Sequence, residues 1–148
     1  MTTLKNQILD VLKATMRAKE MDKLTVIRGL QAAIKQIEVD DRVELGDAQV
    51  LAVIEKQIKQ RKESVKAFLG ANREDLASKE QAEIEVLSQF LPEAMTEEEL
   101  DSIIAQTIAA QEATSMKDMG KVMNSLRPLI AGRADPAQVS AKIKASLA

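Results

Sequence analysis

The stretch GRADPAQV, residues 132–139, holds an arginine in a short joint between two expected helices. Gly132 is typical of a helix end, and Asp135 followed by Pro136 is typical of a helix start. Arg133 lies between these two patterns. A guanidinium beside a helix N-terminus can bind a phosphate together with the free N–H groups of that helix. The alternative is a structural role, in which Arg133 caps the carbonyls of the preceding helix or pairs with Asp135.

Three more cations precede Arg133 in the same part of the chain, and these are Lys117, Lys121 and Arg127. Residues 113–148 contain six Lys or Arg and two Asp, whereas the first 112 residues are acidic in balance. A basic end on an acidic chain favours an anionic partner. The chain has no Tyr or Trp, so RNA binding would use phosphate and 2′-OH contacts rather than base stacking. We take these four cations as candidate nucleic-acid-binding residues.

Catalytic groups are scarce in this sequence. The chain contains neither His nor Cys, which removes the commonest general base and the thiol nucleophile. Glu80, Glu83 and Glu85 could serve as acid–base or metal-binding carboxylates, but a charged helix face with an internal ion pair is the simpler interpretation. We therefore expect no catalytic residues, no metal site and no cofactor.

Two arginines interrupt the apolar pattern of the first half of the chain. Arg61 occupies a position between Ile58 and Val65 where the buried side of a helix is expected, and Arg28 lies at the edge of another such side. A partly buried arginine needs an acidic partner. We expect Arg28 or Arg61 to pair with Glu80 or Glu83, and ligand binding by these arginines is the alternative.

Lysines also recur along one expected helix, which contains Lys56, Lys59, Lys62 and Lys66 together with Glu55 and Glu63. The ordinary interpretation is a solvated face with ion pairs between residues four apart. A stripe that follows phosphates is the second interpretation.

The apolar residues recur with helical spacing throughout, and no run is long enough to span a membrane. The pattern predicts seven helices, the first over about 3–19, with capping residues for the others at Asp22, Asp47, Asn72, Thr96, Ser115 and Asp135. Pro92 and the capping box that begins at Thr96 separate two groups of helices. Pro128 should break or kink the sixth. We expect an all-α protein with a four-helix bundle at 1–92 and a three-helix bundle at 96–148.

Several segments resemble the YqeY family. They include LTVIRGLQAAIKQIEVD, QRKESVKAFLGANREDLASKEQAEIEVLSQFLP and SMKDMGKVMNSLRPLIAGRADPAQVSAKIKASL, so that the resemblance covers nearly the whole chain. The last third also resembles the tail domain of GatB, the tRNA-binding subunit of a glutamine-dependent amidotransferase. The matching positions are Gly120, Val122, Met123, Gly132, Ala134, Pro136, Val139 and Leu147.

The resemblance implies an all-helical fold of two bundles and a role close to glutamine-dependent tRNA amidotransferases. A tRNA-binding or adaptor module is the function that we expect, in the cytoplasm, with tRNA or an amidotransferase-like complex as partner and no membrane association. Two alternatives stay open. One is an accessory subunit with carbon–nitrogen ligase activity that uses glutamine as amide donor, and the other is a protein–protein interaction domain without RNA.

Overall fold

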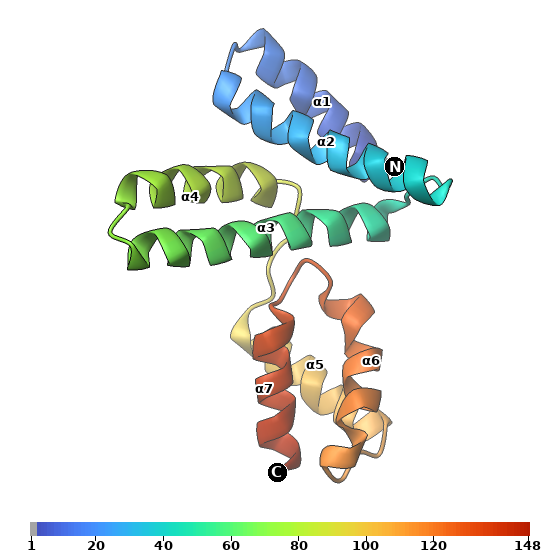
Figure 1. The fold of residues 1–148 in the computed structure, drawn as a ribbon. Coiled ribbons are helices and arrows are strands. Elements are labelled where there is room, and N and C mark those ends of the chain that lie inside the picture. Colours follow the sequence, from blue (N-terminus) through green and yellow to red (C-terminus); the bar gives the residue numbers. More distant parts are fainter. Residues whose placement is uncertain (1–2) are drawn as a thin grey trace. The chain divides into compact units, whose positions relative to one another are not determined.

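The computed structural model describes residues 3–148, and every regular element in that range is helical (Figure 1). The all-α fold expected from the sequence is therefore confirmed. The chain divides into two compact units, an N-terminal unit (Met1–Leu91) and a C-terminal unit (Pro92–Ala148). Each unit has its own buried apolar cluster.

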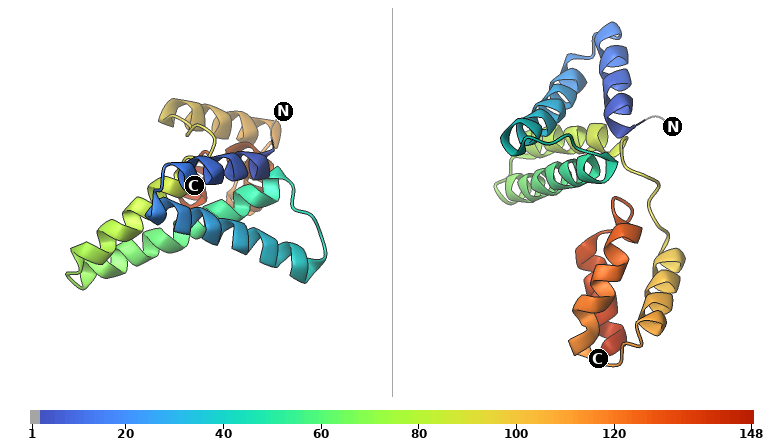
Figure 2. Two further views of the ribbon diagram at one scale, coloured as in Figure 1. Left: turned by 90° about the horizontal axis from the view of Figure 1, so that it is seen from above. Right: turned by 90° about the vertical axis from the view of Figure 1, so that its right-hand side faces the viewer.

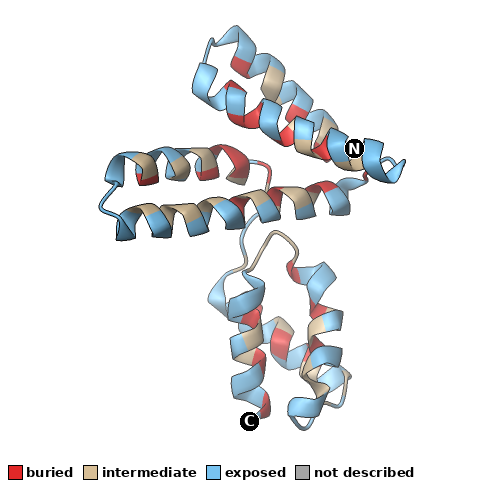
Figure 3. Ribbon diagram, in the orientation of Figure 1, coloured by how far each residue is buried: buried red, intermediate tan, exposed pale blue. Residues whose placement is uncertain are grey.

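The N-terminal unit consists of two helical hairpins that pack against each other (Figures 1 and 2). Its helices are α1 (Leu4–Arg17), α2 (Met21–Asp41), α3 (Asp47–Gly70) and α4 (Glu74–Ser88). Helices α3 and α4 run side by side, while α2 contacts both of them and α1 contacts α3. The buried positions form one stripe on each helix (Figure 3), with Ile27, Leu30, Ile54 and Leu87 fully enclosed.

Hydrogen bonds accepted by two carboxylates connect the first turn of α1 to α2 and to the start of α3. Thr3 is the N-cap of α1, and the Asp47 carboxylate accepts a hydrogen bond from the backbone N–H of Leu4, the first residue of that helix, at 2.9 Å. The Glu38 carboxylate accepts from the Lys5 ammonium and from the backbone N–H of Leu45 at 2.8 Å. The Lys5 hydrogen bond, and then that of Leu45, lowers the pKa of Glu38. These contacts join α1, α2 and the loop before α3.

Three expected helix starts of the N-terminal unit are wrong in detail. Gly46, rather than Asp47, is the N-cap of α3, because the Asp47 side chain bonds to α1 instead. Helix α2 begins after Glu20 without a side-chain cap, and Asp22 lies in its first turn. Asn72 has a φ of 57° and so occupies the left-handed turn that follows α3, a conformation that asparagine tolerates.

The C-terminal unit consists of α5 (Glu97–Ala110), the 3₁₀ turn η1 (Met116–Asp118), α6 (Met119–Ile130) and α7 (Pro136–Leu147) (Figure 1). Its core is made of aliphatic side chains from all three α-helices, including Leu100, Ile104, Val122, Leu126, Val139 and Ile143. The unit has no aromatic residue, so its stability depends on close packing of Leu, Ile and Val.

The helix starts of this unit are closer to expectation. Thr96 and Glu99 form the expected capping box, with backbone-to-side-chain hydrogen bonds of 3.2 and 3.1 Å. Asp135 caps α7 by accepting from the N–H of Ala137 at 3.0 Å. Pro128 does not break α6, because the helix continues past it to Ile130.

Candidate nucleic-acid interface

The turn before α6 determines where Lys117 lies. Ser115 was the expected cap of the sixth helix, but it opens the single turn η1, which then continues into α6. The Asp118 carboxylate accepts from the backbone N–H of Thr114 at 3.0 Å and of Ser115 at 3.4 Å. These hydrogen bonds hold the turn, and Lys117 extends from it into solvent.

Lys121 and Arg127 are exposed on α6, and each donates one hydrogen bond. The Lys121 ammonium reaches the Gln111 carbonyl at 3.2 Å, which lies at the negative end of α5. The Arg127 guanidinium reaches the Asn124 side-chain oxygen at 3.0 Å. Within residues 3–148, no ion pair neutralises Lys117, Lys121 or Arg127. We call these three residues the η1–α6 cations.

Two small features leave the surface around these cations open. Lys121 and Asn124 are three residues apart on α6 and both are exposed, a spacing that puts them on one side of that helix. Gly120 lies between Lys117 and Lys121 and is exposed, with open space where a side chain would be. A bulky anion can therefore approach the first turn of α6 closely.

Arg133 does not join that surface. Its Nε donates to the Glu93 carbonyl at 2.9 Å, and its Nη2 lies 3.6 Å from the Glu99 carboxylate. Its own carbonyl accepts from the N–H of Met95 at 2.9 Å. Arg133 thus fastens residues 93–95 and the start of α5 to the joint before α7. Neither structural role considered from the sequence is the one observed, since Arg133 does not pair with Asp135 and its side chain does not cap α6.

The Arg133 contacts predict a change in protease sensitivity. Replacing Arg133 with Gln should free the segment around Glu93, because the hydrogen bond and the ion pair are both lost. Cleavage by an endoprotease specific for glutamate should then become several-fold faster after Glu93, with the helical content unchanged. Arg127→Gln on the exposed side of α6 is the control and should cleave at the wild-type rate. Equal rates for both variants would show that Arg133 does not restrain the segment.

Lys142 is the cation that the C-terminal unit neutralises most completely. Its ammonium lies 2.7 Å from the Asp101 carboxylate and 2.8 Å from that of Glu97. Asp101, and then Glu97, raises the pKa of Lys142, while Lys142, assisted by Gln138, lowers the pKa of Glu97. The group ties α7 to α5, so its charge is not available to a polyanion. This group is not predictable from local sequence patterns, because Lys142 and its partners are about forty residues apart.

Of the four residues considered for an internal ion pair, the structure brings two together. Arg61 Nε lies 3.5 Å from Glu83 Oε2, and the two side chains are 23% and 22% exposed. The geometry allows attraction but no hydrogen bond, so Arg61 Nε is buried without a hydrogen-bond partner. Arg28 is exposed on α2, and Glu80 is half-buried on α4. Neither is in an ion pair among the described residues.

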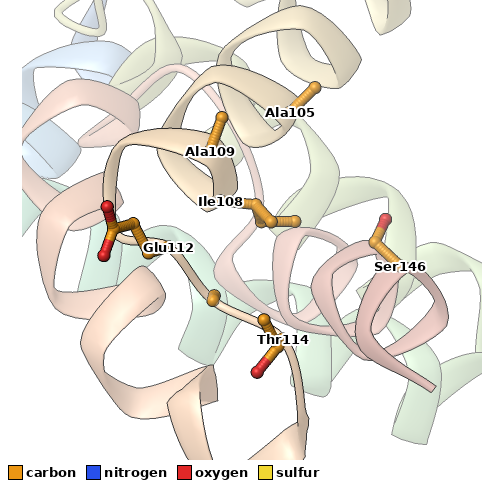
Figure 4. Close-up of a pocket in the computed structure, with 7 residues that line it drawn as sticks. Ala105, Ile108, Ala109, Glu112, Thr114 and Ser146 are labelled. Atoms are coloured by element: carbon orange, nitrogen blue, oxygen red, sulfur yellow. The ribbon is translucent and has the colours of Figure 1, made fainter.

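A shallow depression of about 410 Å³ lies beside the end of α5 (Figure 4). It is lined by Ala105, Ile108, Ala109, Glu112, Ala113, Thr114 and Ser146. One carboxylate and two hydroxyls among small apolar side chains form no nucleophile–base pair. Across residues 3–148, no cluster of three His, Cys, Asp or Glu could hold a metal ion. No described helix has the length and apolar character of a membrane span.

Most of the chain is similar to known proteins. A family model described as Yqey-like protein matches residues 5–147. Three curated proteins named "Altered inheritance of mitochondria protein 41, mitochondrial" are also similar. The one from Pyrenophora tritici-repentis is 35% identical over 136 residues, which cover 90% of this chain and 75% of that protein.

The second of these proteins, from Lachancea thermotolerans, is 35% identical over 100 residues, covering 66% of this chain and 54% of that protein. The third, from Saccharomyces cerevisiae (strain ATCC 204508 / S288c), is 36% identical over 91 residues, covering 61% of this chain and 49% of that protein. The matched regions thus span about half the length of these two relatives.

Proposed function

The chain belongs to the Yqey-like protein family, and from this premise we propose that its C-terminal unit binds tRNA weakly through phosphate contacts. The η1–α6 cations make those contacts, and the protein acts as an adaptor rather than as a catalyst. The relatives' names contain the word "mitochondrial", which describes those proteins, and the cytoplasmic location of this chain stays a prediction.

The observation that carries the proposal is the absence of ion pairs at Lys117, Lys121 and Arg127 within the described residues. In the same unit, carboxylates neutralise Lys142 and Arg133, which leaves four cations without an ion pair to any described residue. Three of them lie on η1 and α6, and the fourth, Lys144, lies in the last turn of α7. Arg133 was part of the surface expected from the sequence. Its contacts with Glu93 and Glu99 now favour a structural role, so the proposed surface rests on three residues.

The number of phosphate contacts determines the expected salt dependence and affinity of tRNA binding. Three phosphate contacts give a slope of about −2 to −3 in a plot of log K against log salt. The affinity at physiological salt should then be in the range of non-specific binding, roughly 10⁻⁴ to 10⁻⁶ M. Binding of this strength suits an adaptor that works beside a stronger partner.

The direct test is fluorescence anisotropy with labelled, unfractionated tRNA at low salt. The variant Lys117→Gln, Lys121→Gln, Arg127→Gln removes the proposed contacts. At about 1 kcal/mol for each contact near water, it should bind about 100-fold more weakly. The matched control Lys13→Gln, Lys79→Gln, Arg28→Gln removes the same charges from exposed positions on α1, α4 and α2 and should bind better than the first variant.

Circular dichroism of both variants should match the wild type, because none of the six residues is buried. Equal binding by the two variants would contradict the proposal. Absence of binding by the wild-type protein would favour the protein-interaction function instead. An accessory role in amide transfer would require that the protein copurify with an amidotransferase.

A further inference from the structure

We propose that α3 carries a second phosphate-binding surface, which binds the same RNA molecule as the η1–α6 cations. This surface, the α3 lysine face, consists of Lys56, Lys59, Lys62 and Lys66. The inference rests on the proposed function, because it supplies the additional contact that weak binding by the C-terminal unit needs.

The spacing of the four lysines puts them on one side of α3. They follow one another at intervals of three, three and four residues, and all four are exposed. With a rise of about 1.5 Å per residue, the face is about 15 Å long. A duplex strand has one phosphate about every 3.4 Å along its axis, so a face of this length matches about four phosphates.

In the described part of the chain, the lysines of this face form no ion pair with the two glutamates that lie among them on α3, Glu55 and Glu63. The ordinary interpretation predicts ion pairs of Lys59 and Lys66 with these glutamates, from which the two lysines are three or four residues away. Among the ion pairs of residues 3–148, none involves the α3 lysine face or these two glutamates. Lys5 and Lys23 elsewhere in the N-terminal unit do have acidic partners.

The apolar side of α3 favours RNA over a lipid surface. A helix that binds a membrane surface needs an exposed apolar face beside its basic residues. On α3 the apolar residues Val50, Ile54 and Ile58 are buried in the core of the N-terminal unit. Leu69, near the end of α3, is 52% exposed, but one such side chain does not form an apolar face. A row of phosphates is therefore the better fit.

Covalent linkage makes two weak surfaces useful. When one surface has bound, the other acts at a high effective concentration, which can raise the overall affinity by about 10²–10⁴ when the geometry permits simultaneous contact. The two surfaces together would also give a steeper salt dependence than the η1–α6 cations alone, because each contact releases counterions.

The test compares salt slopes for the full-length protein with fluorescein-labelled, unfractionated tRNA. The variant Lys59→Gln, Lys66→Gln removes two members of the α3 lysine face. Its slope should be shallower than that of the wild type by about 1.4 to 1.8. The control Lys13→Gln, Lys79→Gln makes the same change of charge on α1 and α4 and should keep the wild-type slope.

The outcomes separate the two proposals. No salt-dependent binding by the wild type would overturn both of them. The η1–α6 variant could lose binding while the α3 variant and its control have the same slope of log K against log salt. That result would overturn only the proposal that the α3 lysine face binds RNA. Equal weakening by the α3 variant and its control would also overturn it, because net charge would then explain the effect. Sedimentation with phosphatidylserine vesicles, without tRNA binding, would assign the lysines to a membrane surface and overturn both.

Discussion

Replacing Leu126 with alanine is expected to unfold the C-terminal unit and leave the N-terminal unit folded. Leu126 has no exposed surface and lies in the middle of the core formed by α5, α6 and α7. Such a truncation typically costs about 2–5 kcal/mol, because apolar burial is lost and a cavity remains. At about 0.05–0.15 kcal/mol per residue, a unit that runs from Pro92 to Ala148 has about 3–9 kcal/mol of stability. The change therefore removes most of it.

The matched control is Leu129→Ala on the same helix. Leu129 is 49% exposed, so its truncation removes little buried surface and should cost well under 1 kcal/mol. Nuclear magnetic resonance spectra of the two variants give the comparison. Leu126→Ala should collapse the resonances of residues 96–148 and leave those of α1 to α4 dispersed. Collapse of both sets together would show that the two units do not fold independently.

The second large effect concerns Arg61 and Glu83. Replacing Glu83 with alanine leaves the mostly buried Arg61 guanidinium without its acidic neighbour. A fully buried charge left alone costs about 3–5 kcal/mol. The observed pair keeps about a fifth of its surface exposed, so we expect a loss of about 1–3 kcal/mol. Urea denaturation measures it, and Arg28→Ala, an exposed arginine on α2, is the control with almost no effect.

Replacing the whole pair should have a different result. In Arg61→Met with Glu83→Leu, no charge remains between α3 and α4, and the buried Nε without a hydrogen bond is removed. The double variant should be as stable as the wild type or more stable, since well-packed apolar residues often replace ion pairs without loss. A double variant clearly less stable than the wild type would show that the pair is a net source of stability.

Local sequence patterns predicted the features that depend on neighbouring residues. The capping box at Thr96 and the Asp135–Pro136 start of α7 were predictable, because both depend on groups within a few positions. Asp47 was expected to cap α3, but its carboxylate accepts its hydrogen bond from Leu4 of α1, which is distant in the sequence. The adjacent residues in the sequence do not show which N–H group such a carboxylate will accept from.

The candidate site shows the same limit. The joint around Arg133 marked that residue as unusual, but its role depends on Glu93 and Glu99, which lie far away in the sequence. In the sequence nothing distinguishes Lys142 from the other cations of this unit, and only the fold shows that it pairs with Asp101 and Glu97. Sequence motifs were sufficient for the family. They were not sufficient to distinguish free cations from those used within the fold.

A titration of the ¹⁵N-labelled protein with unfractionated tRNA at low salt tests the central claim most directly, because it locates the contact. We predict that the amide resonances of residues 117–127 shift progressively and that added salt reverses the shifts. Resonances around the depression that includes Ile108 and Ser146 should stay in place. Shifts confined to that depression, or none along η1 and α6, would contradict the claim that the C-terminal unit binds tRNA through its exposed cations.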